Sequence, residues 1–212
     1  MALVQSIGLA LPARSQLGVG NSVGLPSGLA GENVMSELLP RYSSLTKLGK
    51  VFTARSALQT LSLAGTAMTG LILWNSSPAG SGVDLHLLKC SGDVAATSAT
   101  MTGIALAYGK GQPSAPTTAT LATSTASDYI GGNVGSGIAY SVGTVVTAPI
   151  AQFDVMHNTA AIASTGEDTG FLVDFEGSII VPPQQFVCFV ALGAASAASA
   201  VNLCLKWAEL PA

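Results

Sequence analysis

Residues 186–192 read FVCFVAL, and residues 201–207 read VNLCLKW. In the second stretch, apolar residues occupy every other position from Val201 to Trp207, which is the period of a strand with one buried face. In the first stretch both alternating sets are apolar, which predicts a strand that is covered on both faces. The small residues of 193–200 favour a turn between them. This part of the chain is therefore predicted to form two strands of a buried sheet.

Further short candidate strands occur upstream, separated by turn residues roughly every 10 to 15 positions. They are Val51–Ala54, Leu71–Trp74, Val83–Leu87, Met101–Tyr108, Ser136–Ala148, Ala151–His157, Phe171–Glu176 and Ser178–Val181. The turn at 75–82 predicts a hairpin or a corner. The Ser/Thr/Ala/Pro-rich residues 109–128 predict a long surface loop. Because no long helical pattern separates these strands, we expect an all-β fold, an antiparallel jelly roll or β-sandwich.

The first part of the chain has a different pattern. Glycine, proline and small residues dominate 1–30, without a strand or helix period, which predicts an extended arm. Asn33 is a candidate cap for a short helix that ends near Leu39, because Pro40 follows. We therefore expect an N-terminal arm with a short helical segment over 1–48, and a β domain over 49–212.

The composition limits the functional classes. Hydrophobic residues make up 49% of the chain and charged residues only 9%, against roughly a quarter in a typical soluble domain. A surface with so few charges is expected to be buried against other chains or to be rich in Ser, Thr and Gly. No run of about 20 apolar residues predicts a membrane span, and no secretory signal is recognised, so synthesis in a cytoplasm is expected.

The few charges are unevenly distributed. Residues 1–56 hold five basic and two acidic residues, a net charge of +3, whereas the remainder carries −6. A mildly basic arm on an acidic body suits docking onto an acidic partner surface. Scatter of a small number of charges explains the pattern equally well. The net charge of −3 gives no indication of nucleic-acid binding.

Several residues have the chemistry of a site but lack its context. Ser22 lies in a G-x-S-x-G sequence without the preceding strand of a hydrolase, and Gly103–Gly111 departs from a phosphate-binding loop. His86 and His157 are two histidines, too few for a zinc site. Asp174 and Glu176 share one strand face, which is interpreted as a solvated face rather than an ion site or an acid–base pair. We predict no catalytic residue, no metal and no cofactor.

The three cysteines are Cys90, Cys188 and Cys204. An odd number at wide spacing predicts neither a disulfide framework nor a metal set. Reduced thiols that pack as small hydrophobic groups are the expectation.

Three segments together resemble a group of virion proteins from tailed bacteriophages. They are the SELLPRY stretch of 36–42 with GKVF at 49–52, the GLILWN…PAGSGVDL segment of 70–85, and the IVPP…LKWAE segment of 180–209. These resemble the group's opening stretch, its LWN hairpin and its closing strands with a W-x-E end. The likeness covers about half of the chain, and residues 91–170 have no counterpart in it.

The resemblance implies a trimeric jelly roll on the surface of a phage particle, made in the host cytoplasm. We expect a capsid decoration (cement) protein that binds the major capsid protein or other virion proteins and stabilises the head shell, with no nucleic-acid or membrane partner. A fibre or tail knob that binds a host receptor is the alternative, and a single jelly-roll shell protein ranks below both. An enzyme such as a capsule depolymerase ranks last.

Two sets of residues follow as candidates for these contacts. The expected contacts of the arm with the capsid are Arg14, Met35, Leu38, Leu39, Arg41 and Tyr42. The expected core or trimer-packing residues are Trp74, Phe186, Phe189 and Trp207.

Overall fold

The structure, a computed structural model, describes residues 42–80, 82–96, 103–122, 124–130, 132, 134–157, 169–193 and 199–211. The chain separates into residues 1–44 and a compact unit of residues 45–212, which contains the described strands. The short helix α2 (Ser43–Lys47) precedes them, and its last residue is basic, which suits the negative end of a helix dipole. The predicted arm and the helix expected near Asn33 lie outside the described residues.

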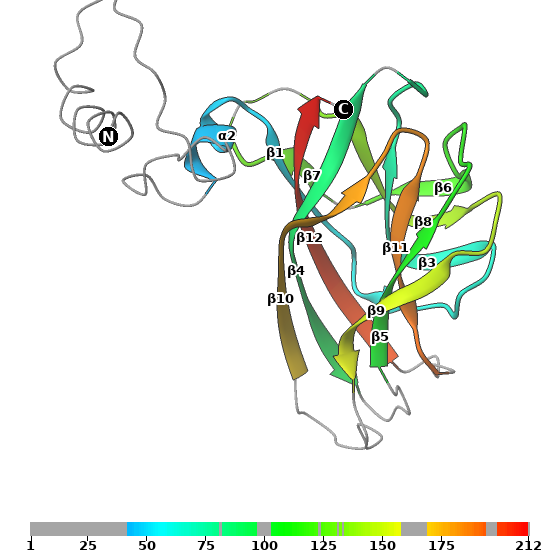
Figure 1. Ribbon diagram of the computed structural model, residues 1–212. Helices are drawn as coiled ribbons and strands as arrows, with labels where there is room; N and C mark the ends of the chain where they lie inside the picture. The colour runs from blue at the N-terminus through cyan, green and yellow to red at the C-terminus, as the bar shows by residue number, and fades with distance from the viewer. Residues whose placement is uncertain are drawn as a thin grey trace, which may run out of the picture. The chain divides into compact units, whose positions relative to one another are not determined.

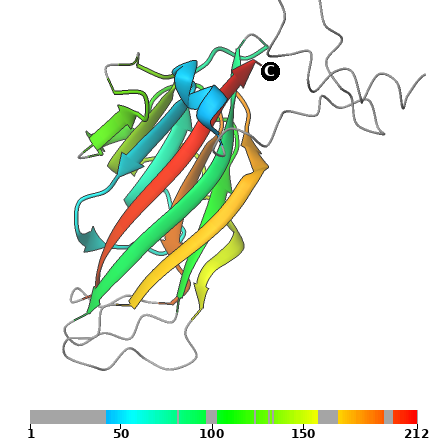
Figure 2. The ribbon, with the colours of Figure 1, turned by 90° about the vertical axis from the view of Figure 1, so that its left-hand side faces the viewer.

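Two antiparallel sheets form the compact unit (Figure 1). The first sheet has the order β10 (Thr169–Val181), β4 (Val83–Ala96), β12 (Ser199–Pro211), β1 (Val51–Arg55) and β7 (Ser124–Ser127), and β2 (Gln59–Thr60) also pairs with β12. The second sheet has the order β6 (Thr117–Leu121), β8 (Gly137–Thr144), β3 (Ala67–Asn75), β11 (Phe186–Ala191), β5 (Gly103–Gly109) and β9 (Ile150–His157). Figure 2 looks onto the first sheet, with β12 in red between β4 and β1.

The strand order is that of a jelly roll. Eight strands form the four-stranded orders β1-β12-β4-β10 and β3-β11-β5-β9, one in each sheet. Strands β6 to β8 are inserted between β5 and β9 and extend both sheets on the side of β1 and β3. This confirms the predicted all-β jelly-roll or sandwich class. Because β3 and β4 belong to different sheets, the turn between them is a corner and not a hairpin.

The inter-sheet core is made by the inward faces of both sheets. Strand β12 contributes alternate residues from Val201 to Trp207, all at most 1% exposed, as its period of two predicts. Phe189 of β11 faces them from the second sheet. The Trp207 ring stacks on Phe52 with 5.9 Å between ring centroids. The two strands at 186–192 and 201–207 therefore hold the centre of the sandwich, one in each sheet.

A second group of buried side chains lies on the outward face of the second sheet, and we call it the outer cluster. Its members are Met68, Ile72, Trp74, Ala105, Ala107, Tyr140, Val145, Phe186, Cys188 and Val190. Every residue of β11 is buried, which confirms that this strand is covered on both faces. Gly109 is required here, because a Cβ at that position would overlap the Phe186 ring.

Residues 110–116 and 145–149 contact the outer cluster through Gln112 and Val145, and we call them the covering segments. The Trp74 indole Nε1 donates to the Gln112 backbone oxygen at 2.9 Å. The buried Gln112 side chain donates to the Ser114 carbonyl oxygen at 2.8 Å and accepts from the Val146 backbone N–H at 2.9 Å, which joins the two segments. The second face of β11 is therefore covered by the same chain.

Two expectations need correction. Residues 109–128 are not one long loop, because they include β6 and β7, whose Ser/Thr/Ala composition hid them from a hydrophobic pattern. All five β6 residues are exposed. Ser178–Val181 is not a separate strand but the second half of β10, which pairs with β4 on both sides of a register shift between Asp174 and Ile179.

Candidate binding surfaces

The predicted packing residues lie inside the single chain. Phe189 and Trp207 belong to the inter-sheet core, and Trp74 and Phe186 belong to the outer cluster. Trp74 is the most accessible of the four at 7% exposure. Their rings are therefore packed within the protomer, and little ring surface is left for a second chain.

The predicted arm contacts are not placed by the structure. Arg14, Met35, Leu38, Leu39 and Arg41 lie outside the described residues. Tyr42 is the first described residue, precedes α2 and is half-buried.

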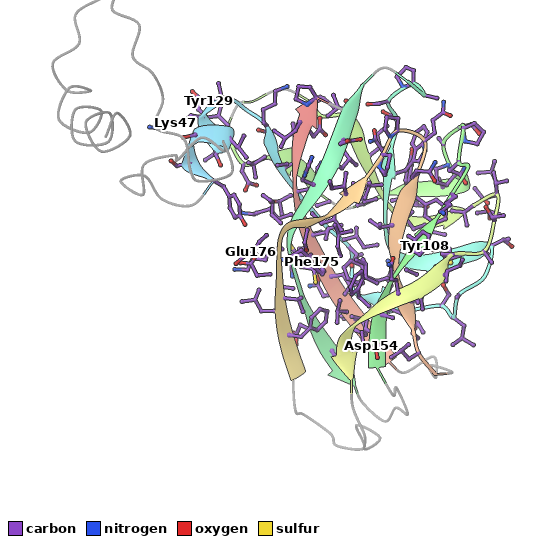
Figure 3. The ribbon with its side chains drawn as sticks, in the orientation of Figure 1. Lys47, Tyr108, Tyr129, Asp154, Phe175 and Glu176 are labelled. Carbon is purple, nitrogen blue, oxygen red and sulfur yellow. The ribbon has the colours of Figure 1, made fainter. Side chains whose placement is uncertain are left out.

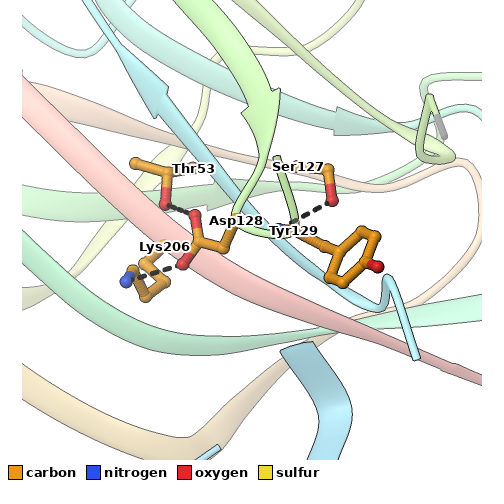
Figure 4. Close-up of polar contacts among 5 residues, drawn as sticks. All are labelled: Thr53, Ser127, Asp128, Tyr129 and Lys206. Atoms are coloured by element: carbon orange, nitrogen blue, oxygen red, sulfur yellow. Dashed lines mark hydrogen bonds and ion pairs between the residues drawn. The ribbon is translucent and has the colours of Figure 1, made fainter. Parts of the chain in front are cut away.

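The outward face of β1, β4 and β12 is polar, and we call it the polar face. Lys206 of β12 forms an ion pair with Asp128, with 2.7 Å between Nζ and Oδ2. The Thr53 hydroxyl of β1 donates to the other Asp128 oxygen at 2.5 Å (Figure 4). Asp128 follows β7, so these contacts tie the insertion to the jelly-roll strands β1 and β12.

A shallow hollow of about 310 Å³ lies on this polar face, with Cys204 at its edge. The Arg55 Nε donates to the Asn202 side-chain oxygen across it at 3.0 Å. Burial raises the pKa of the Cys204 thiol above its ordinary value, more than the hydrogen bond with Ser91 and the nearby positive charges lower it. Because the thiolate is the nucleophilic form, Cys204 is not activated for covalent chemistry.

Glu209 is a buried carboxylate near the end of β12, at 4% exposure. It accepts hydrogen bonds from the backbone N–H groups of Ser136 and Gly137, both at 2.8 Å, and from the Trp207 indole at 3.2 Å. Three donors satisfy the charge that burial would otherwise destabilise. The W-x-E sequence therefore has a structural role, since it fastens the start of β8 to β12.

Among the exposed large apolar side chains of the described residues, two groups stand close together in the chain or on neighbouring edge strands. Tyr129, Ile130 and Val134 lie beyond β7 in the insertion, and the last two are 97% and 98% exposed. A second group lies on the edge strands β9 and β10 and consists of Ile150, Phe153, Leu172 and Ile180. Scattered apolar residues are normal on a surface, but nearly complete exposure of neighbouring aliphatic side chains favours a contact with a partner.

The residues with catalytic or metal-binding chemistry are dispersed. Asp174 and Glu176 are both exposed, and Glu176 has a φ of 53° at the β10 bulge, where its N–H donates to Asp174 Oδ1 at 3.1 Å. His86 is half-buried on β4 and His157 ends β9. Ser22 lies outside the described residues. No group of three or more His, Cys, Asp or Glu residues is placed to hold a metal within the described ranges.

The Gly103–Gly111 sequence is a strand followed by a turn. Residues 103–109 form β5, and the Gly111 N–H donates to the Gln185 side-chain oxygen at 3.2 Å. That amide is therefore engaged with the protein itself. The geometry is that of a strand end and not of a phosphate-binding loop.

Comparison with known proteins does not assign the chain to a family. No family model matches the sequence, and neither the curated proteins nor the solved structures contain a match. In the part of the chain that the structure describes, no helix is both long and apolar enough to cross a membrane.

Proposed function

We propose that this protein is a virion structural protein, a capsid decoration protein that binds a phage head shell as a trimer. The observation that carries the proposal is the exposed apolar surface of the insertion on a jelly roll whose own core is complete. Ile130 and Val134 have nothing to pack against within the described chain, although the inter-sheet core and the outer cluster are both closed. Burial against other subunits would remove this apolar area from water.

The low charge of the chain supports an assembled state. Charged residues make up about a quarter of a typical soluble domain, whereas they are 9% of this chain. The resemblance of residues 36–52, 70–85 and 180–209 to phage virion proteins supports the same role. The trimer, the capsid partner and the particle surface are parts of this proposal.

Copy number in purified particles tests the proposal. Quantitative mass spectrometry of virions should find hundreds of copies of this chain for each particle, measured against the main shell protein. A few to a few dozen copies would favour a fibre or vertex knob instead. Absence of the chain from particles would contradict a virion role of any kind.

Light scattering on the purified full chain tests the trimer separately. The expected mass is three times that of the 212-residue chain. An Ile130→Asp, Val134→Asp double variant should weaken association, whereas Leu63→Asp, a matched exposed position outside the insertion, should not. A monomeric wild-type chain at high micromolar concentration would contradict the trimer.

A further inference from the structure

A cleft of about 340 Å³ opens at the edge of the sandwich where β9 and β10 are the outermost strands of their sheets. Its walls come from the second half of β10 and from β5, β9 and β11. A volume of this size fits the range of small-ligand sites, about 300–1,000 Å³, and is too small for a folded partner. The cleft is distinct from the exposed apolar group of the insertion.

The floor of the cleft is apolar. Ile179, Ile180 and Pro182 give its accessible apolar lining, and the buried Phe186 and Val187 of β11 also border it. The bulge in β10 shapes this wall, because Glu176 and Gly177 both have positive φ, and the register with β4 shifts there. A bulge of this kind bends a strand and redirects the side chains beyond it. Figure 3 places Phe175 and Glu176 at this bend and Tyr108 on the β5 side.

Three polar side chains that line the cleft have donors or acceptors left over among the described residues. Tyr108 is half-buried, and its hydroxyl makes no hydrogen bond with the described residues. The exposed Gln152 side chain on β9 likewise has no partner among them. Gln185 uses its oxygen to accept from Gly111, which leaves its amide hydrogens as donors. The rim thus offers both donors and acceptors around an apolar floor.

Lys110 gives the cleft its charge. It is the sole charged residue in the described lining, and its Nζ lies 5.8 Å from the centroid of the Tyr108 ring. No ion pair of Lys110 occurs within the described part of the chain. The protein as a whole has a net charge of −3, so a positive side chain at the cleft makes this site more favourable for an anionic ligand than the rest of the surface.

We propose that this cleft binds an acidic saccharide, a sugar ring that bears a carboxylate. A pyranose ring has apolar C–H faces that pack on aromatic and aliphatic side chains, and hydroxyl groups that exchange hydrogen bonds with amides and a phenol. Tyr108, Gln152 and Gln185 provide these partners, and Lys110 pairs with the carboxylate. A lipid or an apolar peptide would leave the polar rim groups unpaired, which costs affinity. This proposal does not depend on the capsid role.

Ligand-observed NMR and calorimetry on the full-length purified chain test the proposal. The probes are methyl glucuronide and its uncharged counterpart methyl glucoside. We expect dissociation constants in about the millimolar range, with the glucuronide bound about tenfold more tightly, which is the gain from one charge-assisted hydrogen bond. Gln152→Ala should weaken both sugars at least several-fold, and Tyr108→Phe should do so while keeping the ring.

Lys110→Gln separates the acidic specificity from sugar binding in general. This exposed substitution should remove the preference for glucuronide and leave glucoside binding unchanged. The matched controls are Lys89→Gln on the polar face and Tyr129→Ala in the insertion, which should change neither sugar. The proposal is overturned if the wild-type chain binds neither sugar at about 20 mM, or if binding is the same in the cleft variants. Equal affinity for both sugars would overturn the acidic specificity.

Discussion

The outward faces of the two sheets differ in what covers them. The face of β3, β11 and β5 is apolar and is closed by the covering segments of the same chain. The face of β1, β12 and β4 is polar: Arg55 and Asn202 pair across neighbouring strands, and Lys206 pairs with Asp128 beyond β7. The central strands β3, β11 and β5 of the second sheet are therefore buried on both sides, whereas the first sheet has one buried side and one polar side.

The difference shows how a chain with many apolar residues buries most of their side chains. Phe186, Cys188 and Val190 belong to the outer cluster and are at most 1% exposed, and Trp74 of the same cluster is hydrogen-bonded to Gln112 of the covering segments. The second sheet therefore contributes to two cores instead of one. Among the described residues, the most exposed large apolar side chains, Ile130 and Val134, lie in the insertion.

The largest effect is expected from a ring deletion in the outer cluster. Phe186→Ala should lower the free energy of unfolding by about 3–5 kcal/mol, because the ring is completely buried against Gly109 and leaves a cavity. Arg55→Ala on the polar face is the control and should cost less than about 1 kcal/mol. Urea unfolding measures both. If both variants lowered the free energy of unfolding by the same small amount, the outer cluster would not contribute to stability.

The covering segments should depend on one buried amide. Gln112→Ala removes the acceptor for the Val146 N–H, and because Val146 is itself exposed and water can replace that acceptor, the expected cost is about 0.5–1.5 kcal/mol. Hydrogen exchange at the Val146 amide should become faster. Gln152→Ala, at an exposed glutamine, should be nearly neutral in the same unfolding experiment. Slow exchange at Val146 in the variant would show that another group holds the segments together.

The cysteines on the two faces should differ in their accessibility to a thiol reagent. Cys188 of the outer cluster is fully buried, whereas Cys204 on the polar face is partly accessible. Iodoacetamide should therefore modify Cys204 slowly in the native protein and Cys188 only after unfolding. Mass spectrometry of the labelled peptides gives the answer. Modification of Cys188 at the rate of Cys204 would mean that the covering segments open readily.

The buried thiols also predict a loss of stability at alkaline pH. Burial raises the pKa of Cys90 to about 12 from 9.0, and it also raises the pKa of Cys188. Above pH 9 the unfolded chain loses these protons and the folded chain keeps them, so the free energy of unfolding falls as pH rises from about 9 to 12. The slope is at most about 1.4 kcal/mol per thiol and pH unit. Cys188→Ala should flatten it in urea unfolding at pH 8, 9.5 and 10.5.

The smallest effect is expected on the polar face. Asp128→Asn removes the charge that pairs with Lys206, and because the Lys206 side chain is 37% exposed, the loss should stay below about 1 kcal/mol. The difference from wild type should shrink further at high salt. Thermal unfolding at about 20 mM and 500 mM salt measures it. A loss of several kcal/mol would mean that the pair fixes the insertion on β1 and β12.

The predictable parts of this fold are those with an apolar period. The alternation from Val201 to Trp207 gave β12 and its inward face, and the doubly apolar 186–192 gave a strand buried on both sides. Strands β6 and β7 were missed because their Ser/Thr/Ala composition carries no apolar period, and they pair with β8 and β1. The sequence also could not show that 110–116 would cover the second face, because Gln112 acts through hydrogen bonds from distant segments.

The surfaces were harder to predict for the same reason. Because Lys206 alternates with apolar residues, the sequence predicts that it lies on the solvent-facing side of its strand. Its partner Asp128 lies 78 positions away, and nothing in the local sequence indicates that the two side chains pair. The cleft joins Tyr108, Gln152 and Ile180, which no spacing rule brings together. The W-x-E sequence was part of the resemblance to phage proteins. Only the structure shows its physical basis, which is that the Glu209 carboxylate accepts hydrogen bonds from two backbone N–H groups.

The central position of β12 has a consequence for how the protein folds. This last strand lies between β1 and β4, so the contacts that complete the first sheet join residues such as Ser56 and Leu203, which are 147 positions apart. Contacts of such high sequence separation make closure entropically costly and folding slow. A nascent chain emerging from a ribosome holds β1 and β4 without the strand that bridges them. Chains that stop before β12 should therefore stay unfolded and open to proteases.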